Sequence, residues 1–480
     1  MLNLWIITVL VLGLLYFHRV KARGRKKGSI PGPLIGRLTT YYRVWLLMWG
    51  DAPRRYAELH RKYGPVVQTG PYHISISESH WIPIVYDTKH RFRKGRFYDV
   101  FRPLYKGKPL DTVFTTSDPA LNKHLKHSLL LNLLNKPHLY IEDIDYSVFV
   151  FIQEMEAAKG KSIDLSSWIF YWAFDMTYAL VFGDHFGYMR SGKDFNGMVS
   201  SFKSIVRSAA VLGQVPKWCS ITLANKRFMG ICRSFSSFPD PTIQLLEEIE
   251  RKIQKHDTQM HSCGKSLLCR VLSSGDHKLN ENAYDEAVNV LFEAFLAAAG
   301  EVAVSVTTII YCLLNNQRVY NTLTETVRSR TDPDHIYLNG VIKEALRVHT
   351  SNSPPIERVV PTGGLNVDGY FIQEGTVLGI PQYLAHRDQA VFGIDAEDFR
   401  PERWLEADPP TMKSMDQNFM TFGKGCRGCV GRELAMIEMR TFVTKVFTKL
   451  DVRWASSTRP KTANYWMMEY FDFHVTFAAA

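Results

Sequence analysis

The pattern of hydrophobic and polar residues along the chain predicts a mainly helical protein with a small β component. Residues 51–64 have the spacing of an amphipathic helix, and helical periodicity dominates from about residue 140 to 350. Short β-like runs lie within 65–77 and 356–382, and residues 465–477 alternate as strands do. No internal repeat or second linker is visible after Pro31, so one folded body is the simplest organisation.

The longest predicted helix runs from about Asn282 to Asn316, and its middle is apolar nearly all round. A helix of this composition belongs in the core of a large protein. By length it could also span a membrane, but Glu293 and Glu301 within it make that position costly. Gly300 in mid-helix costs roughly 1 kcal/mol relative to alanine, which indicates a kink or the close approach of a ligand.

The first 33 residues have a different pattern from the rest. Leu2 to Phe17 is free of charge, and as a helix it would span about 24 Å, slightly less than a bilayer core of roughly 30 Å. A basic tract, Arg19 to Lys27, follows instead of a small-residue cleavage site, which favours an uncleaved single-pass anchor over a signal peptide. Positive charge on that side predicts a cytosolic body. We therefore expect an anchor at 1–18, a basic and Pro/Gly linker at 19–33, and one domain at 34–480.

Composition and charge exclude some classes of protein. The chain is 46% hydrophobic and 22% charged, as ordinary globular proteins are. Six of its 58 basic residues lie between Arg19 and Lys27 and supply more than half of the net charge of +11, so a nucleic-acid-binding body is not indicated. A basic tract beside an apolar segment favours contact with membrane lipid. Seven unpatterned cysteines do not form a disulfide framework and fit a reducing compartment.

The stretch from Phe422 to Met439, FGKGCRGCVGRELAMIEM, carries the most specific chemistry. A glycine-rich loop delivers Cys429 to the start of an amphipathic helix, whose N-terminus favours a thiolate. Gly425 and Gly431 leave room for a large flat group, and Arg427 can pair with an anion. An iron porphyrin with carboxylate tails requires this combination.

Other interpretations of the same cysteines are a zinc site, a dithiol redox pair, or a lone buried cysteine. Cys426-x-x-Cys429 has no second CxxC or HxxxH partner, which disfavours zinc. No thioredoxin-like βαβ pattern surrounds the pair, which disfavours a redox dithiol.

Five residues of this stretch match all the fixed positions of the signature F-x-x-G-x-R-x-C-x-G: Phe422, Gly425, Arg427, Cys429 and Gly431. The chain therefore resembles the cytochromes P-450, in which the signature binds haem, and Ala435 falls where members often have a small residue. The resemblance implies the P-450 fold, with haem b between the long central helix and the loop of Cys429, the thiolate ligand of the iron. Residues 168–187 and 463–473 are similar to fungal pisatin demethylase-like members.

Two further motifs occur upstream in the order of the family. Glu344 and Arg347 have the E-x-x-R spacing, which places both charges on one helical face, and Arg403 lies in the PERF-like stretch 399–404. The resemblance implies a buried cluster of these three charges that locks the Cys429 loop. We expect them to be structural.

The resemblance also implies contacts to the haem propionates. Arg358 and His386 lie where family members make them. The helix that usually offers Trp or His with an Arg four residues later reads NKHLKHS from residue 122, so Lys126 or His127 is expected to serve instead.

The central helix departs from the family pattern A-G-x-D/E-T, whose acid and alcohol help to deliver protons to dioxygen. Here residues 297–303 read AAAGEVA. In one register Glu301 replaces the acid and Val302 the alcohol; in the other, Val302 replaces the acid and Ala303 the alcohol. Neither keeps the threonine, and Ser305, one turn further on, could substitute only if the helix is distorted. Glu301 is either the surviving acid, which we expect, or a residue that faces a water channel.

The resemblance implies a monooxygenase that inserts one oxygen atom of dioxygen into a hydrophobic small molecule, in fungal secondary-metabolite biosynthesis or detoxification. Electrons would come through a partner, NADPH-cytochrome P-450 reductase with its flavins, or cytochrome b5, at the endoplasmic reticulum membrane. Family position suggests the following substrate-lining residues: Phe101, Phe295, Ala299, Val302, Pro355 and Met467.

Two alternatives follow from the missing threonine. The protein could be a haem-thiolate isomerase, dehydratase or peroxide-using enzyme, or a degenerate haem-binding protein without turnover. The intact Cys429 motif and the charge cluster weigh against the last of these.

Overall fold

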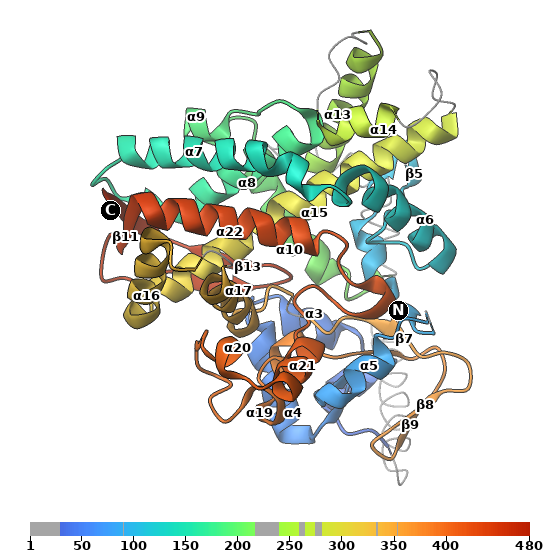
Figure 1. Ribbon diagram of the computed structural model, residues 1–480. Helices are drawn as coiled ribbons and strands as arrows, with labels where there is room; N and C mark the ends of the chain where they lie inside the picture. The colour runs from blue at the N-terminus through green and yellow to red at the C-terminus, as the bar shows by residue number, and fades with distance from the viewer. Residues whose placement is uncertain are drawn as a thin grey trace, which may run out of the picture.

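A computed structural model describes residues 29–89, 91–216, 240–258, 265–273, 281–332, 335–352 and 354–480. The expected anchor at 1–18 and most of the linker at 19–33 lie outside these residues, as do Cys219, Cys232 and Cys263. The other four cysteines are free. Within the described residues, large helices form the upper part of the molecule in Figure 1, and a smaller part that includes the strands labelled β7, β8 and β9 lies below them.

The helical expectation is confirmed. The α-helices are α2 (Leu34–Leu38), α3 (Tyr41–Leu47), α4 (Ala52–Tyr63), α5 (Ile82–Val85), α6 (Pro119–Leu129), α7 (Ile141–Ala157), α8 (Leu165–Phe182), α9 (Tyr188–Ser191), α10 (Met198–Leu212), α13 (Pro241–Thr258), α14 (Leu267–Ser273), α15 (Glu281–Leu314), α16 (Gln317–Ser329), α17 (Ile336–Val348), α18 (Gln382–Ala385), α19 (Gln389–Phe392), α20 (Arg403–Glu406), α21 (Pro409–Asn418) and α22 (Arg432–Lys449). Shorter turns are the 3-10 helices η1 (Ser79–Trp81), η2 (Arg96–Phe101), η4 (Pro137–Tyr140) and η5 (Gly425–Arg427) and the π-turn η3 (Leu130–Leu134).

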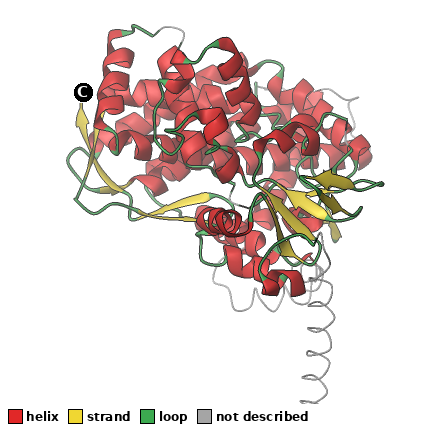
Figure 2. Cartoon of the chain, turned by 90° about the horizontal axis from the view of Figure 1, so that it is seen from below, coloured by secondary structure: helices red, strands yellow, loops and turns green. Residues whose placement is uncertain are grey.

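The strands lie at the margins of the helical body (Figure 2). They are β1 (Val66–Gly70), β2 (His73–Ile76), β3 (Arg93–Lys94), β4 (Leu104–Tyr105), β5 (Lys108–Pro109), β6 (Ile163–Asp164), β7 (Arg358–Val359), β8 (Leu365–Val367), β9 (Tyr370–Ile372), β10 (Val377–Gly379), β11 (Leu450–Trp454), β12 (Lys461–Asn464), β13 (Met468–Phe471) and β14 (His474–Ala479). One sheet has the order β1-β2-β10-β7-β3, in which only β2 and β10 are parallel. β11-β14-β6 form a second sheet, and three hairpins pair β12 with β13, β4 with β5, and β8 with β9.

The helix α15 runs through the middle of the helical part, as expected from its apolar composition (Figure 1). It is long and apolar enough to cross a membrane, but 67% of its most hydrophobic window is buried inside the protein. Val288, Leu291, Ile309 and Leu313 are inaccessible along its length. α15 is therefore the core helix that its sequence predicted.

Candidate active site

Cys429 lies at the end of a loop between η5 and α22 that its own backbone holds closed. The Cys429 amide donates to the Phe422 carbonyl over 2.7 Å, and the Gly428 amide donates to the Gly425 carbonyl over 3.1 Å. The Cys426 amide donates to the Asp87 carbonyl over 3.0 Å, which ties the loop to the segment after α5. These bonds fix the position of the Cys429 backbone two residues before the N-cap of α22, Gly431.

The two glycines of the signature serve different purposes. Gly425 has φ +63°, and a Cβ there would lie 2.1 Å from the Tyr86 carbonyl oxygen. Its lack of a side chain therefore lets two backbones meet and does not clear space for a ligand, in contrast to our expectation. A Cβ on Gly431 would meet nothing within 4 Å except the Cys429 sulfur at 3.9 Å, so Gly431 does leave room beside the thiol.

The Cys429 side chain is accessible to solvent, yet burial raises the pKa of its thiol. We infer from these two facts that the sulfur faces a space inside the protein. The Gly431 amide and Lys126 lower the pKa, and Glu301 and Glu293 of α15 raise it. The helix N-terminus acts as the sequence predicted, but burial outweighs it, and a bound metal ion would be needed to hold the thiolate.

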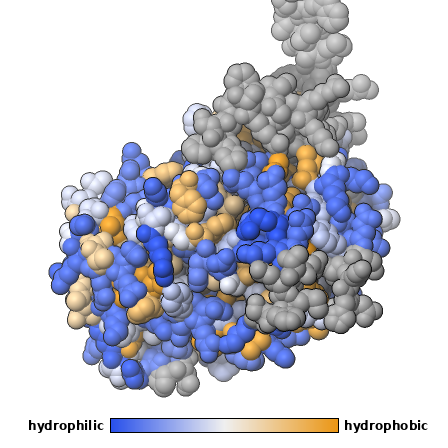
Figure 3. All heavy atoms as spheres, turned by 90° about the horizontal axis from the view of Figure 1, so that it is seen from above, coloured by the Kyte–Doolittle hydropathy of each residue, from blue (hydrophilic) through white to orange (hydrophobic). Residues whose placement is uncertain are grey.

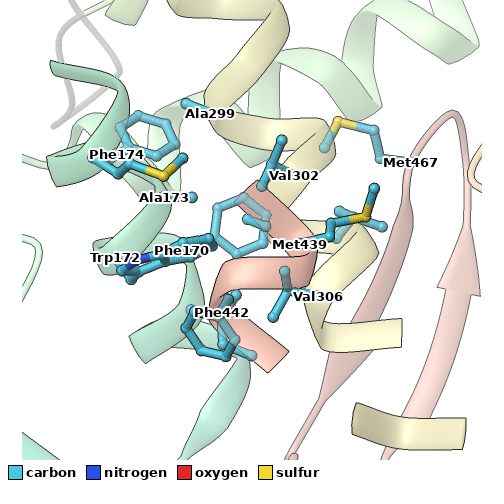
Figure 4. Packing of buried hydrophobic residues seen from close by; sticks show 14 of the residues in the cluster. Phe170, Trp172, Ala173, Phe174, Ala299, Val302, Val306, Met439, Phe442 and Met467 are labelled. Carbon is cyan, nitrogen blue, oxygen red and sulfur yellow. The ribbon is translucent and has the colours of Figure 1, made fainter. Parts of the chain in front are cut away.

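One face of α15 packs against α8. Phe295, Ala299, Val302 and Val306 follow the i, i+4, i+7, i+11 spacing of one helical face, and all four are buried. The Phe295 ring contacts Phe174 at 5.7 Å between centroids, and Figure 4 shows Ala299 and Val302 beside Phe170, Ala173 and Phe174. The structure thus places three expected substrate residues, Phe295, Ala299 and Val302, in the core between two helices.

Another face of α15 carries the residues that act on Cys429. Glu293, Ala297, Glu301 and Ser305 are four residues apart, and Ala297 is exposed although it lies in the middle of a core helix. Glu301 accepts a hydrogen bond of 2.8 Å from the Ser351 hydroxyl, and burial raises the pKa of its carboxyl. The Ser305 hydroxyl donates to the Glu301 backbone carbonyl over 2.7 Å.

Gly300 allows two protein side chains to approach the backbone of α15 closely. A Cβ there would lie 2.5 Å from the Phe202 ring and 3.0 Å from the Met467 methyl group. Phe202 and Met467 also line an outer pocket of about 480 Å³ between α8, α10 and β13. Met467 therefore lies against the central helix, as expected for a wall residue, and the close neighbour predicted from Gly300 is a phenylalanine ring.

Lys94 and Arg358 form the centre of a group of four cations beside the Cys429 loop. They are direct partners across β3 and β7, and each is less than a tenth exposed. Like charges placed opposite each other destabilise a sheet. Burial lowers the pKa of Lys94 well below its usual value, and Arg358, Arg427 and Lys126 lower it further. Glu293 of α15 raises it in part, and a bound anion would stabilise the charged form of Lys94 further.

The other two cations of the group bind backbone carbonyls. Lys126 donates to the Cys426 and Gly428 carbonyls over 2.5 and 3.2 Å, and Arg427 donates to the Thr116 carbonyl over 3.0 Å. Lys94 donates to the Phe114 carbonyl. Within the described residues, none of the four forms an ion pair with a carboxylate. We call Lys94, Lys126, Arg358 and Arg427 the open cation group.

Two histidines expected near the haem lie elsewhere. His127 is on α6 next to Lys126, but its side chain is exposed, so Lys126 is the residue that reaches the loop. His386 is fully buried, and its Nε2 accepts the Met420 amide over 2.7 Å while Nδ1 lies 3.3 Å from the Arg347 carbonyl. Because both ring nitrogens have protein partners, His386 is not available for a propionate, which corrects our expectation.

Glu344, Arg347 and Arg403 do form a buried cluster. The Arg347 guanidinium donates to both Glu344 oxygens over 2.8 and 2.9 Å, and Arg403 Nε donates to Glu344 over 2.9 Å. Trp404 and the Arg400 amide donate to the same carboxylate. The remaining Arg347 nitrogen donates to the His386 and Ala396 carbonyls. We call these three charges the closed cluster, since each is paired and all are less than 5% exposed.

The remaining predicted residues lie as follows. Phe422 packs edge-on against Phe419 with 6.4 Å between ring centroids, and the Ala435 amide donates to the Gly431 carbonyl at the start of α22. Phe101 packs with Phe114 and Trp466, at 5.5 and 5.6 Å between ring centroids. Pro355 packs beside Gly379 of β10. In the described residues no three His, Cys, Asp or Glu side chains converge on a metal site.

Sequence reasoning missed Lys94 and Ser351. Lys94 sits in an ordinary run of basic residues, RFRKGR, and only its pairing with β7 distinguishes it from the others. Ser351 is 50 residues from Glu301 along the chain and carries no motif. Both depend on contacts between distant segments, for which the sequence offers no local signal.

The comparisons agree with the geometry. A family model described as cytochrome P-450 matches residues 27–471. The cytochrome P-450 monooxygenase mpaDE of Penicillium roqueforti is 30% identical over 464 residues, which cover 92% of this chain and 54% of the relative. The chain thus spans about half the length of that relative. The cytochrome P-450 monooxygenase mfmA of Annulohypoxylon moriforme is 29% identical, over 91% of this chain and 89% of its own length. With the family model spanning nearly the whole chain and its signature cysteine held in the loop described above, this protein belongs to the cytochrome P-450 family.

Proposed function

We propose that the protein is a haem-thiolate monooxygenase that inserts one oxygen atom of dioxygen into a hydrophobic small molecule, in fungal secondary metabolism or detoxification. The observation that carries this proposal is the placement of Cys429. Glu301 of α15 acts electrostatically on its accessible thiol, and beside the loop lie four cations that form no ion pair with a carboxylate of the described residues. The names of the fungal relatives support the reaction class.

The residues present fit haem b. Cys429 would bind the iron through its thiolate, and Gly431 leaves space beside the sulfur. Lys94, Arg358, Arg427 and Lys126 would pair with the two carboxylate tails, which would neutralise the open cation group. When bound, the haem supplies the activation of dioxygen, and the cysteine ligand donates electron density that favours cleavage of the O–O bond.

The residues of α15, across from the Cys429 loop, would control the access of protons and water. Glu301 lies on the same face of α15 as the exposed Ala297, and burial raises the pKa of its carboxyl, which favours a group that can hold and release a proton. The face of α15 that packs on α8 excludes water behind it. Phe101, expected to line the substrate site, packs with Phe114 and Trp466, and such a cluster of rings would suit contact with an apolar substrate.

We propose that the electrons come from NADPH-cytochrome P-450 reductase, with cytochrome b5 as a second donor, at the endoplasmic reticulum membrane. Six large hydrophobic residues of α2, α3 and their flanks support membrane attachment because they are 43–61% exposed: Leu34, Ile35, Tyr41, Trp45, Met48 and Trp49. They follow directly after the predicted anchor and basic tract. On the face seen in Figure 3, by contrast, hydrophobic residues are scattered among hydrophilic ones.

Deletion of residues 1–27 tests the attachment. We expect only partial release from microsomes, because the apolar patch at α2–α3 still contacts lipid. Adding Trp45→Glu and Trp49→Glu to the deletion should complete the release in a flotation assay, with haem content unchanged. Full release by the deletion alone would exclude a role for the patch.

The carbon monoxide difference spectrum tests the ligand. Cys429→Ser should lose the thiolate-type band or fail to retain haem, whereas Cys426→Ser, the matched control in the same loop, should keep it. A thiolate-type band in Cys429→Ser would refute the assignment.

Product analysis tests the reaction against its alternative. Reconstitution with reductase, NADPH and isotopically labelled dioxygen, over a panel of fungal terpenoids, polyketides and alkaloids, should give products that carry the label. The alternative is favoured by the sequence of the central helix, because neither Val302 nor Ala303, the two expected positions, carries an alcohol. Rearranged or dehydrated products without label would identify a haem-thiolate isomerase or dehydratase.

A further inference from the structure

The helical geometry of α15 points to a third register for the degenerate motif. In A-G-x-D/E-T the alanine and the threonine are four residues apart and share one face of a helix. The pair with that spacing on the face toward Cys429 is Ala297 and Glu301, since Ala297 is exposed and Glu301 acts electrostatically on the thiol. Glu301 therefore stands where the alcohol is expected, and Val302 and Ala303 point into the core.

The carboxyl of Glu301 has a hydroxyl partner from another part of the chain. Ser351 Oγ donates to Glu301 Oε2 over 2.8 Å, and Ser351 is only 7% exposed. The other nearby hydroxyl, that of Ser305, donates to the Glu301 backbone carbonyl and not to the carboxyl. In the described residues Ser351 is thus the side chain that orients this carboxyl.

Ser351 is held in place from two sides. It follows the end of α17, the helix that carries Glu344 and Arg347 of the closed cluster. The preceding carbonyl, that of Thr350, accepts a hydrogen bond of 2.8 Å from the Asn464 amide group at the end of β12. A hydroxyl on such a rigid support can fix the direction of its hydrogen bond.

From this geometry we infer that Ser351 is a positioning residue, and that Glu301 and Ser351 together replace the acid and alcohol of the family motif with their places exchanged. The acid stands on the central helix, and the α17–β7 connection supplies the alcohol. Glu301 presents a proton toward the space in front of Cys429, and Ser351 holds the carboxyl in one orientation. This inference rests on the proposed function, since it concerns proton delivery to dioxygen.

The charged surroundings of Glu301 are simple. Cys429 faces it from the loop and Ser351 from the α17–β7 connection, while Glu293, two turns away on its own helix, is paired electrostatically with Lys94. Burial raises the pKa of the Glu301 carboxyl, and the Ser351 hydrogen bond lowers it, because a hydrogen bond to the ionised form stabilises that form. Loss of the hydroxyl should therefore raise the pKa further.

The first measurement does not depend on turnover. Infrared difference spectra of the full-length holoenzyme, titrated with pH, should contain a carboxyl band that Glu301→Gln removes. In Ser351→Ala this band should titrate about one pH unit higher, a roughly tenfold change in the ionisation constant, and Ser351→Thr should restore the native value. Ser305→Ala, the control on the same face, should leave the titration unchanged. A band that does not move in Ser351→Ala, or that moves equally in Ser305→Ala, overturns the inference.

The second measurement uses the holoenzyme with reductase, NADPH and dioxygen, without added substrate. Reduction of dioxygen to peroxide takes two electrons and two protons, and reduction to two waters takes four of each. Poorer proton delivery should raise the ratio of peroxide formed to NADPH consumed in Ser351→Ala by several-fold, with Ser351→Thr close to the native ratio.

A shifted band with an unchanged peroxide ratio at every pH would show that Ser351 does not act in proton delivery, and would overturn the inference. A failure of the native enzyme to oxygenate any substrate would refute the proposed function and leave the infrared result standing, so the two failures are distinguishable.

Discussion

Two groups of buried charge flank the Cys429 loop, and they differ in how their partners are supplied. In the closed cluster, Glu344 accepts from both Arg347 and Arg403, and the protein itself satisfies the charges. In the open cation group, Lys94 and Arg358 face each other across a sheet and their described partners are backbone carbonyls and aromatic rings. The first group is paired within the folded chain. In the second, Glu293 attracts Lys94 electrostatically, but no carboxylate of the described residues forms an ion pair with any of the four cations, so a ligand would supply the paired counter-charge. The difference separates a structural lock from a binding site.

Breaking the closed cluster should have the largest effect. Glu344→Ala removes the carboxylate from two buried guanidinium groups, and uncompensated buried charges of this kind cost about 3–5 kcal/mol. We expect a fall of many degrees in the thermal midpoint and loss of haem on purification, measured by scanning calorimetry and absorbance. A variant as stable as the native protein would show that the cluster does not lock the fold.

Glu438 is a third kind of buried charge, since it belongs to neither group and has no hydrogen-bond partner within the described residues. Glu438 of α22 is 1% exposed, and within the described residues neither carboxylate oxygen has a hydrogen-bond partner. Burial raises the pKa of this carboxyl to about 8. Below pH 4.5 the group is neutral in both states. As the pH rises, the unfolded chain loses its proton first, so folding loses stability up to about pH 8.

Glu438→Met should therefore be more stable than the native protein at pH 8, by at most about 4 kcal/mol, and nearly equal to it at pH 5. Thermal midpoints at the two pH values measure this difference. An equal effect at both pH values would mean that packing, and not the proton, determines the result.

A mutation in the open cation group should stabilise the haem-free protein and weaken haem retention in the haem-loaded protein. Lys94→Met removes a buried charge that faces Arg358, so the haem-free protein should gain about 1–3 kcal/mol. The haem-loaded protein should lose haem faster, because one cation for the carboxylate tails is gone. Unfolding of the haem-free form and transfer of haem to apomyoglobin measure the two effects, with Lys94→Arg as the charge-conserving control. Stabilisation of both forms would contradict the distinction between the two groups.

The sequence predicted those elements whose pattern is local. The amphipathic spacing of residues 51–64 anticipated α4, and the β-like runs after Pro65 anticipated β1 and β2. The extent of α15 was anticipated within two residues at each end. Glu344 and Arg347 were placed on one helical face by their spacing alone, whereas Arg403 required the family resemblance.

The site depended on information that periodicity does not contain. α15 is apolar nearly all round, so its composition could not say which face packs on α8. Ala299 and Val302, expected to line the substrate pocket, are buried on the face toward α8, and their contact with substrate stays a prediction. His386 was placed at the haem, but its ring completes the surroundings of Arg347. Only the fold brings Lys94 opposite Arg358 and Ser351 into contact with Glu301, because each pair joins segments far apart in the chain.

The smallest expected effect comes from an ion pair adjacent in sequence to the closed cluster. Glu402 precedes Arg403 and pairs with Arg318 through two hydrogen bonds of 2.6 and 3.0 Å. The Arg318 side chain is 60% exposed, however, so water screens the pair and solvates each charge when the other is removed. Glu402→Ala should then change the free energy of unfolding by less than about 1 kcal/mol, against the several kcal/mol expected for Glu344→Ala. The backbone carbonyl of Glu402, which accepts from the Leu405 and Glu406 amides, is unaffected by the substitution.

Denaturant titrations of the two variants side by side, at low and at high salt, test this expectation. A loss in Glu402→Ala as large as that in Glu344→Ala would mean that pairing matters here regardless of burial, and the contrast between the closed cluster and its surroundings would no longer hold. A small loss that disappears at high salt would show that burial is the reason why the closed cluster contributes more to the free energy of unfolding. The two pairs otherwise share charge type, hydrogen-bond lengths and neighbouring positions in the chain.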